Sequence, residues 1–262
     1  MAATAALPAG GLDIRWADSE DEVREAQRLR YHVFVQELGA RLPAPADAAP
    51  GHDTDRFDPF CDHLLVRATG PGDAGGGPLV GTYRVLAPRG ARGAGGLYTD
   101  TEFDTRALAA IRPRAVELGR SCVRPGWRSG SVIMAMWSAL CQYMLQHELD
   151  TMIGCASVGL HDGGATARGL WQRLRTTHLV DARWHVRPYR AYPLGDPTGP
   201  SSSPQGDQAE SPTPPLIKGY LRCGARLLGP PAHDENFNTA DLPMMLNIDD
   251  FSRRYRRHFL GR

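Results

Sequence analysis

Residues 115–145, AVELGRSCVRPGWRSGSVIMAMWSALCQYML, decide the fold of this chain. The stretch begins with a partly apolar, β-branched run that ends at Val123, and it closes with a long apolar run from Ser131. We therefore predict a central strand over Ala115–Val123, a basic turn, and a central helix over Ser131–His147. N–H groups in the turn and the first helical turn lack intrahelical partners, and the helix dipole favours negative charge. The turn is a candidate anion site; the alternative is an ordinary strand–turn–helix connection with a surface arginine.

The central strand carries two charged residues, Glu117 and Arg120, three positions apart. In a regular strand they would point to opposite faces of the sheet. Gly119 lies between them, where a β-bulge could re-aim one side chain and release backbone N–H groups from the ladder. We therefore expect a splayed strand that could hydrogen-bond an extended substrate. The alternative is a strand glutamate held in an ion pair.

The composition limits the class of protein. The chain has 262 residues, 42% of them hydrophobic and 23% charged, which is typical of a soluble globular protein with a proper core. A net charge of +1 gives no global electrostatic argument for nucleic acid. Five scattered cysteines without a Cys-x-x-Cys pair predict a reducing cytosol, with neither disulfides nor a structural zinc site. The N-terminus lacks the pattern of a signal peptide, and the run from Ser131 to Leu145 is shorter than the roughly 20 residues that span a bilayer.

Before the central strand, hydrophobic periodicity predicts a short strand at Leu12–Trp16 and a long helix. The helix begins with a capping box at Ser19–Glu22 and runs to about Leu38, where Gly39 closes it. The later elements are two strands, His63–Arg67 and Leu79–Leu86, a flexible loop, Pro88–Gly96, and a short helix, Glu102–Ile111.

After the central helix we predict a buried strand at Thr151–Val158. The elements that follow are a helix at Thr166–Arg175, a strand at Trp184–Ala191, a helix at Leu216–Cys223, strands at Ala225–Leu228 and Leu242–Ile248, and a final helix at Asp249–Leu260. The Pro/Ser-rich segment Pro193–Pro215 cannot bury apolar surface and is predicted to be a flexible insertion. The order predicts one α/β domain over residues 1–262, with a mixed β-sheet flanked by helices.

The turn after the central strand resembles the acyl-donor site of the GNAT acyltransferases. Their pattern Val-x-Pro-x-x-Arg-x-Gly is met by Val123, Pro125, Arg128 and Gly130. Ser131 stands where a later glycine is usual. The resemblance therefore implies a donor with a single phosphate, the phosphopantetheine arm of an acyl carrier protein, rather than the pyrophosphate of coenzyme A, and no further cofactor.

Further motifs occur in the order found in the ornithine-lipid N-acyltransferases, a GNAT branch related to the acyl-homoserine lactone synthases and often labelled hemolysin-like. They are Leu29–Phe34, Asp53–Asp58, Cys61–His63, Gly81–Arg84, Glu117–Val123, Pro215–Arg222 and Phe237–Asp241. The resemblance runs from about residue 20 to the C-terminus and skips the insertion. It implies transfer of a long, commonly 3-hydroxylated acyl chain from acyl carrier protein to the α-amine of ornithine, giving lyso-ornithine lipid.

The resemblance also implies site residues. Glu117 is the expected base, through water, Arg120 positions the donor or pairs with Glu117, and Tyr220 protonates the departing thiolate. The expected donor-binding residues are Ser121, Cys122, Val123, Arg128, Ser129 and Gly130. The expected acceptor-binding residues are Asp58, Asp62, His63 and Arg84, within an acidic run that suits two amines and is otherwise a solvated loop. No metal is expected, because no ligand spacing supports one.

Several readings stay open. Cys122 or Cys61 could act as a nucleophile with His63, or the chain could be a non-catalytic docking module for carrier protein or membrane. The same chemistry could use another amine, such as glycine, glutamine or a homoserine-lactone precursor. The terminal arginine cluster could meet acidic carrier protein or an anionic membrane from the cytoplasmic side, or be a solvated helix face.

Overall fold

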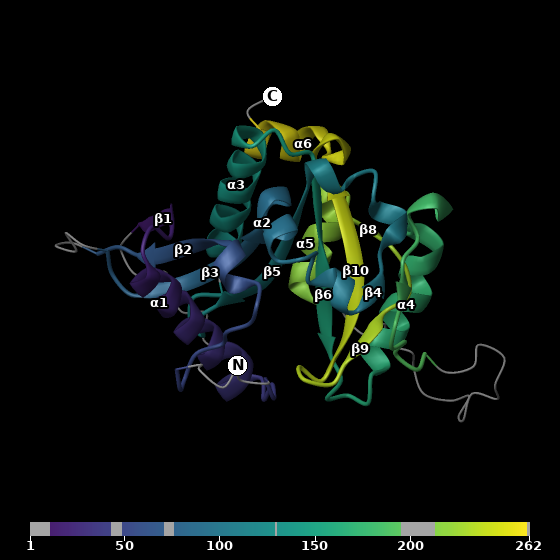
Figure 1. Cartoon of the computed structure of the whole chain (residues 1–262), viewed down its shortest axis with the longest axis horizontal. Coiled ribbons are helices and arrows are strands. Elements are labelled where there is room, and N and C mark those ends of the chain that lie inside the picture. The colour runs from purple at the N-terminus through teal and green to yellow at the C-terminus, as the bar shows by residue number, and fades with distance from the viewer. Residues whose placement is uncertain (1–10, 43–48, 71–75, 129, 195–212, 261–262) are drawn as a thin grey trace.

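A mixed sheet of eight strands forms the centre of the computed structural model, which describes residues 11–42, 49–70, 76–128, 130–194 and 213–260 (Figure 1). The strand order is β1-β2-β3-β5-β6-β10-β8, and β9 also pairs with β10. The strands are β1 (Leu12–Trp16), β2 (Asp62–Ala68), β3 (Leu79–Leu86), β5 (Ala115–Val123), β6 (Thr151–Gly159), β8 (Arg226–Leu227), β9 (Ala232–Asp234) and β10 (Thr239–Asn247). Two short strands, β4 (Phe103–Asp104) and β7 (Arg187–Pro188), pair separately.

The neighbours β5 and β6 run parallel, and α3 (Gly130–Gln146) is the crossover between them. They pair only from Ala115↔Thr151 to Glu117↔Ile153, and beyond that point the two strands part. The predicted splayed strand is therefore confirmed.

A β-bulge in β5 accompanies the parting of the strands. On the β3 side, Thr82 faces Cys122 but Arg84 faces Gly119, so Tyr83 opposes two residues, Arg120 and Ser121. Arg120 has a positive φ of 51°, which is unusual for a residue other than glycine. The bulge predicted at Gly119 thus lies one residue later, and the conformational strain falls on Arg120.

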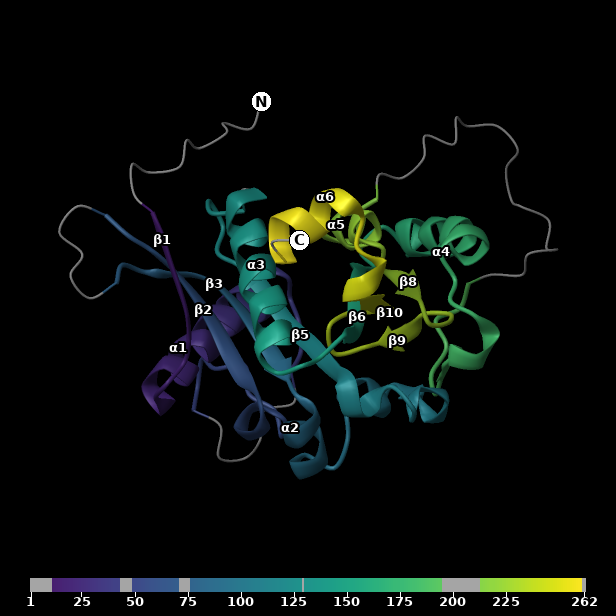
Figure 2. The ribbon, with the colours of Figure 1, turned by 90° about the horizontal axis from the view of Figure 1, so that it is seen from above.

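Helices cover both faces of the sheet (Figure 2). On one face, α1 (Glu20–Tyr31) continues into a π-helical turn (His32–Glu37) and packs Ala26, Leu29 and Val33 against strand residues such as Leu65. On the other face, α3, α4 (Ala165–Thr177) and α5 (Pro215–Cys223) share the largest core cluster with the strands. Gly39 closes the first helix, as predicted, and Gly224 caps α5, which ends at Cys223 as predicted; both glycines have positive φ.

The capping box is confirmed in position but not in detail. Ser19 is the N-cap of α1 and makes no side-chain capping hydrogen bond. Glu22 instead accepts a hydrogen bond from the backbone N–H of Asp18, at 3.1 Å. The start of the helix is therefore stabilised by the acidic residues of its first turn and by the hydrogen bond that Glu22 accepts.

Several predicted elements differ in the structure. The loop predicted at Pro88–Gly96 contains α2 (Pro88–Gly93), and the helix predicted at Glu102–Ile111 is replaced by single 3₁₀ turns and β4. The Asp100 carboxylate accepts from the backbone N–H of Leu97 at 2.8 Å and from Arg112 at 2.9 Å, which holds the segment in turns. Phe103 is then fully buried.

The strand predicted at Trp184–Ala191 is replaced by a 3₁₀ turn (Ala182–Trp184) and the short strand β7. Nearer the C-terminus, β9 was not predicted, and β10 begins three residues earlier than predicted. The final helix divides into a 3₁₀ turn (Ile248–Asp250), α6 (Arg253–Tyr255) and a π-helical turn (Arg256–Leu260). Most of the Pro/Ser-rich insertion, residues 195–212, lies outside the described residues. Within the described part of the chain, no helix is both long and apolar enough to cross a bilayer.

Candidate active site

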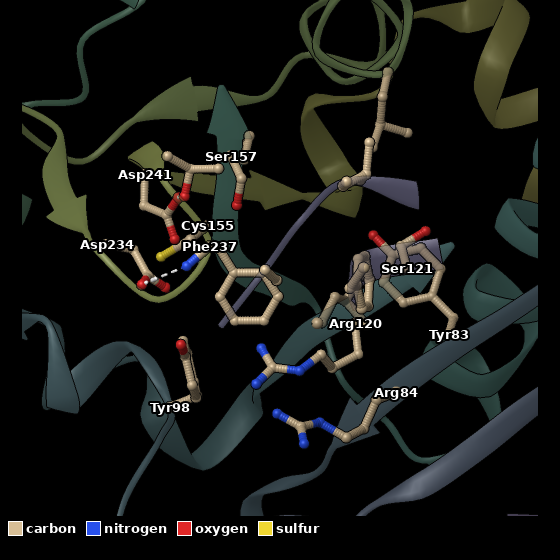
Figure 3. Close-up of a pocket in the computed structure, with 18 of the residues that line it drawn as sticks. Tyr83, Arg84, Tyr98, Arg120, Ser121, Cys155, Ser157, Asp234, Phe237 and Asp241 are labelled. Carbon is tan, nitrogen blue, oxygen red and sulfur yellow. Dashed lines mark hydrogen bonds between the residues drawn. The ribbon is translucent and has the colours of Figure 1, made fainter. Parts of the chain in front are cut away.

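A cavity of about 370 Å³ opens where β5 and β6 part. The residues that line it come from both arms of the splay and from the loops above them, and Figure 3 shows many of them. Of the predicted site residues, five line this cavity: Arg84, Glu117, Arg120, Ser121 and Tyr220. The bulge explains why Glu117 and Arg120, three apart on one strand, reach the same space.

Three arginines and three aspartates form a buried ion network at one wall of the cavity: Arg30, Arg84, Arg120, Asp53, Asp55 and Asp58. Arg30 is fully buried and binds both oxygens of Asp58, at 3.0 and 2.8 Å. The pKa of Asp58 is lowered, because the charges and hydrogen bonds of the arginines outweigh the effect of burial, which acts the other way. The charges balance, so this acidic run is neither a solvated loop nor a free set of negative charges.

Arg120 joins the network to the cavity. Its Nη2 lies 3.2 Å from Asp55, and its guanidinium stacks over the rings of Tyr98 and Phe237 at 5.1 and 4.7 Å. Its Nε is 3.2 Å from Asp53 but makes no aligned hydrogen bond. The guanidinium of Arg120 thus bridges the ion network and the two aromatic rings, which also line the cavity.

Glu117 is 4% exposed, and its carboxylate holds the loop above the cavity. It accepts hydrogen bonds from the backbone N–H of Tyr98 at 2.5 Å, from that of Thr99 at 2.7 Å, and from the Thr99 hydroxyl. Burial raises the pKa of Glu117, while these hydrogen bonds act in the opposite direction. The predicted base is therefore in the cavity wall, already engaged by three donors.

Tyr220 lies between the polar cavity and two apolar pockets. Its hydroxyl is 2.6 Å from the hydroxyl of Tyr83, and burial raises the pKa of both phenols. The two tyrosines also line two smaller pockets of about 60 and 30 Å³, together with apolar residues from α3, β6 and β10 such as Met152, Trp137 and Leu246. An apolar route thus leads from the cavity toward the helices behind the sheet.

A second group of carboxylates lies across the cavity from the arginines (Figure 3). Asp234 and Asp241 line the cavity, and Glu102 lies beside Asp241 and Cys155, with their ligand atoms all within 4.8 Å of one another. Asp241 is 4% exposed and accepts a hydrogen bond from Thr239 at 2.7 Å. Among the described residues, none of these three carboxylates has a basic side chain within ion-pair distance. We call Glu102, Asp234 and Asp241 the carboxylate cluster.

Burial and mutual repulsion raise the pKa values of Glu102 and Asp241. Burial is the larger cause for both Glu102 and Asp241, and neighbouring negative charges add to it. Arg120 and the Thr239 hydroxyl partly oppose the effect at Asp241. A buried carboxylate group without a counter-cation is a place where a positively charged ligand gains binding energy.

Sequence reasoning did not assign a role to this cluster, although two signals were present. In Thr239–Leu246 the apolar residues alternate from Ala240, so Asp241 points to the opposite face, that of the cavity. The second signal is the family motif Phe237–Asp241, which contains this aspartate. The prediction that started the strand at Leu242 left Asp241 in a loop.

The predicted anion-binding turn is held by an ion pair. Arg128 binds both oxygens of Glu37 at 2.6 and 2.5 Å, and its Nε donates to the Val123 carbonyl at 3.0 Å. Gly130 begins α3, a 17-residue helix, so its N-terminus lies beside this turn, and Ser129 is outside the described residues. That Arg128 and Gly130 bind the donor stays a prediction, because the guanidinium of Arg128 is paired with Glu37 in this structure.

The remaining predicted residues lie outside the cavity lining. Cys122 is buried against α1 and Val123 in the main core. His63 is 2% exposed behind Asp58, and Asp62 accepts a hydrogen bond from Tyr143 at 2.6 Å. Burial raises the pKa of Cys61 and of Cys122 to about 12, so both thiols are protonated near neutral pH, which does not favour the cysteine-nucleophile reading.

Comparison with known proteins agrees with this architecture. Residues 29–138 match the family described as acetyltransferase (GNAT) domain. The acyl-homoserine lactone synthase LasI aligns with a TM-score of 0.54 at 13% identity, covering 97% of this chain and 96% of that one. FeeM, an N-acyl amino acid synthase from uncultured soil microbes, aligns with a TM-score of 0.53 at 13% identity, covering 92% and 93%. At these identities the two structures show the fold alone, which together with the domain match is the fold of the GNAT class.

Relatives in sequence identify the branch of the GNAT class to which the chain belongs. The chain is 37% identical over 255 residues to the L-ornithine N(alpha)-acyltransferase of Brucella abortus, which covers 95% of this chain and 89% of the relative. It is 37% identical over 256 residues to the Rhizobium meliloti protein of the same name, covering 95% and 84%. The chain belongs to the L-ornithine N(alpha)-acyltransferase family.

Proposed function

We propose that this enzyme transfers a long acyl chain from the phosphopantetheine thioester of an acyl carrier protein to the α-amine of ornithine, giving lyso-ornithine lipid. The observation that carries the proposal is the carboxylate cluster, which has no basic partner among the described residues and shares one cavity with Arg84 and Arg120. Ornithine carries two ammonium groups and one carboxylate. Its charges are complementary to this arrangement.

For the acceptor, Asp234 and Asp241 bind ammonium and the guanidinium of Arg120, which lines the same cavity, binds the carboxylate. Of the acceptor residues expected from the sequence, Arg84 lines the cavity, while Asp58 and His63 act through the network that fixes the two arginines. Glu102 lies beside Asp241, and its raised pKa keeps it largely protonated near neutral pH until a bound ammonium favours its ionised form. An acceptor with one net positive charge fits this site better than neutral glycine or glutamine.

For the donor, the pantetheine arm runs along the freed edge of β5 at residues 118–121, whose backbone groups no longer pair with β6. Its phosphate binds at the N-terminus of α3, where it competes with Glu37 for Arg128. The acyl chain occupies the apolar pockets behind Tyr83 and Tyr220. The thioester carbonyl is then at the junction, beside both phenols.

The reaction forms a C–N bond and breaks the C–S bond of the thioester. The α-ammonium first gives one proton to Glu117 through water, and the neutral amine attacks the carbonyl carbon. Collapse of the tetrahedral adduct expels the thiolate, and Tyr220, a protonated phenol, supplies its proton. The second amine proton reprotonates the tyrosine through solvent, so the net products are amide, thiol and one proton.

The test is a thiol-release assay with purified protein, 3-hydroxyacyl carrier protein and a panel of amines, with mass spectrometry of the product. We expect release that depends on ornithine. Release with a neutral amine alone would keep the chemistry and reject the acceptor. Binding of carrier protein without release for any amine would favour a docking module.

The carboxylate cluster could also hold a metal ion, because two carboxylates and a thiol converge there. An ammonium site predicts that a chelator leaves ornithine-dependent release unchanged. Loss of activity with the chelator, restored by one divalent metal, would assign the cluster to a metal.

A further inference from the structure

The outer face of the last helical segment is strongly basic. Arg253, Arg254, Arg257 and His258 are exposed, and in the described part of the chain none of the three arginines forms an ion pair. Arg256 is different, because it donates to the backbone carbonyls of Phe251, at 3.0 Å, and Asp249. We call residues 251–259 the C-terminal segment. Its three unpaired guanidinium groups face solvent.

The inner face of the same segment covers the end of the apolar route. Phe251 and Phe259 line the apolar pocket of about 30 Å³ together with Trp137. Trp137 stacks on Tyr220 with ring centroids 5.4 Å apart, and it meets Phe259 edge-on at 6.4 Å. Aromatic side chains therefore connect the reaction cavity with the underside of the C-terminal segment.

The segment lies away from the donor turn. Helix α3 begins beside the donor turn at Gly130, whereas its later residues Leu140 and Cys141 line the pocket under Phe259. Figure 1 shows α6 at the upper end of α3, and Figure 2 shows it lying across α3 and α5. A carrier protein that delivers its arm at the N-terminus of α3 would approach the other end of the helix.

We propose that the C-terminal segment docks on the headgroups of an anionic phospholipid bilayer and places the distal end of the acyl pocket against the membrane. The inference rests on the proposed function, because an acylated amino acid is amphiphilic and belongs in a bilayer. Guanidinium groups bind phosphate strongly, and several basic residues near an anionic surface act additively. The C-terminal segment thus presents basic side chains to the headgroups on its outer face and aromatic side chains to the acyl chain on its inner face.

The test is co-sedimentation of the full chain with vesicles of phosphatidylcholine alone and of phosphatidylcholine mixed with phosphatidylglycerol. We expect binding to the anionic vesicles only, lost at high salt because counter-ions screen exposed charges. Replacing Arg253, Arg254 and Arg257 by Gln lowers the partition coefficient roughly 100-fold. The charge-matched control replaces Arg175, Arg183 and Arg187, which are exposed on α4, on the 3₁₀ turn after it and on β7, and keeps the binding. Absence of binding to anionic vesicles, or equal loss in both variants, overturns the proposal.

Turnover kinetics distinguish a membrane-docking role of the C-terminal segment from binding of the acyl carrier protein. Without vesicles, the Arg253/Arg254/Arg257 variant should match the parent protein in KM for acyl carrier protein. A raised KM with intact vesicle binding would assign the segment to the carrier protein and overturn the proposal. Vesicle binding by a parent protein that shows no turnover would support the docking surface and reject the proposed function.

Discussion

At the residue scale, two sets of carboxylates face opposite walls of one cavity and differ in their partners. Asp53, Asp55 and Asp58 are neutralised by arginines, whereas Asp234 and Asp241 have no basic partner among the described residues. A buried negative charge that lacks a cation binds one from a substrate without first breaking an ion pair. The second set is therefore the better candidate for recognising a cationic acceptor.

Replacing Asp241 by Asn removes this charge while keeping a similar shape. We expect the KM for ornithine to rise roughly 10- to 100-fold, the loss of one charge-assisted hydrogen bond, with a smaller change in kcat. Thermal stability should hold or increase, because an uncompensated buried charge is removed. Steady-state kinetics and a thermal melt check both expectations.

Glu235→Gln is the matched control, since Glu235 is exposed beside Asp234 and pairs with Arg190 at 2.7 Å. Its KM should equal that of the parent protein. If Asp241→Asn raised the KM of a neutral amine as much as that of ornithine, the cluster would not recognise the ammonium charge.

Replacing Glu117 by Gln tests the base. The amide oxygen of Gln can still accept from the two Thr99 donors, while its NH2 group would face the backbone N–H of Tyr98, so a thermal melt checks that the loop above the cavity stays in place. We expect kcat to fall roughly 100-fold, with the KM of both substrates little changed. The pH–rate profile should lose its acidic limb, which reports protonation of Glu117. An unchanged kcat would place the base elsewhere, with the Glu102–Asp241 pair as the next candidate.

At the scale of elements, the splay of β5 from β6 depends on close backbone packing at the point where the strands part, one residue beyond their last pair. Gly154 of β6 lies against the carbonyl of Leu118, and a Cβ at Gly154 would come within 2.4 Å of that oxygen. No larger residue fits there unless the strands move. The cavity geometry therefore depends on one glycine as well as on the bulge at Arg120.

We expect Gly154→Ala to lower the free energy of unfolding by about 1–3 kcal/mol, the usual effect of forcing extra volume into a packed site. Gly119→Ala is the control, because a Cβ there meets nothing within 4 Å and its φ is not positive. Denaturant unfolding measures both variants. Equal destabilisation would show that the Leu118 contact does not set the position of β6.

At the scale of the whole molecule, the carboxylate cluster makes stability depend on pH. Burial and neighbouring negative charge raise the pKa of Glu102 to about 8 and that of Asp241 to about 6. Between the ordinary carboxyl pKa and these raised values, the folded state binds more protons than the unfolded state, so stability falls as pH rises. Asp234, Arg120, Tyr98 and Cys155 are the other charged or titratable groups that face the pair.

We therefore expect the melting temperature to decrease from about pH 5 to about pH 8, and Glu102→Gln to flatten that slope. Ornithine should oppose the loss, because a bound ammonium favours the ionised carboxylates. Melting curves across this range, with and without ornithine, check the sign. A slope that is unchanged in Glu102→Gln would assign the dependence to other groups.

The sequence by itself determined the elements with strong local signals. A β-branched run, a Gly/Arg turn and a long apolar run were enough to place β5 and α3, and a glycine between two charged residues was enough to predict a bulge. Glycines at helix ends fixed the ends of the first helix and of α5, because φ is positive there. In all of these the physical cause lies within a few residues of the chain.

Only the tertiary structure decided which charges meet. The acidic run looked available for a substrate, yet Arg30 and Arg84, from α1 and β3, neutralise most of it. Asp241 and Glu102, 139 positions apart, converge because β10 pairs with β6 and the turns after α2 fold over both strands. Charge pairing acts through space at a few ångströms, whereas sequence patterns report spacing along one element, so the candidate site required the fold.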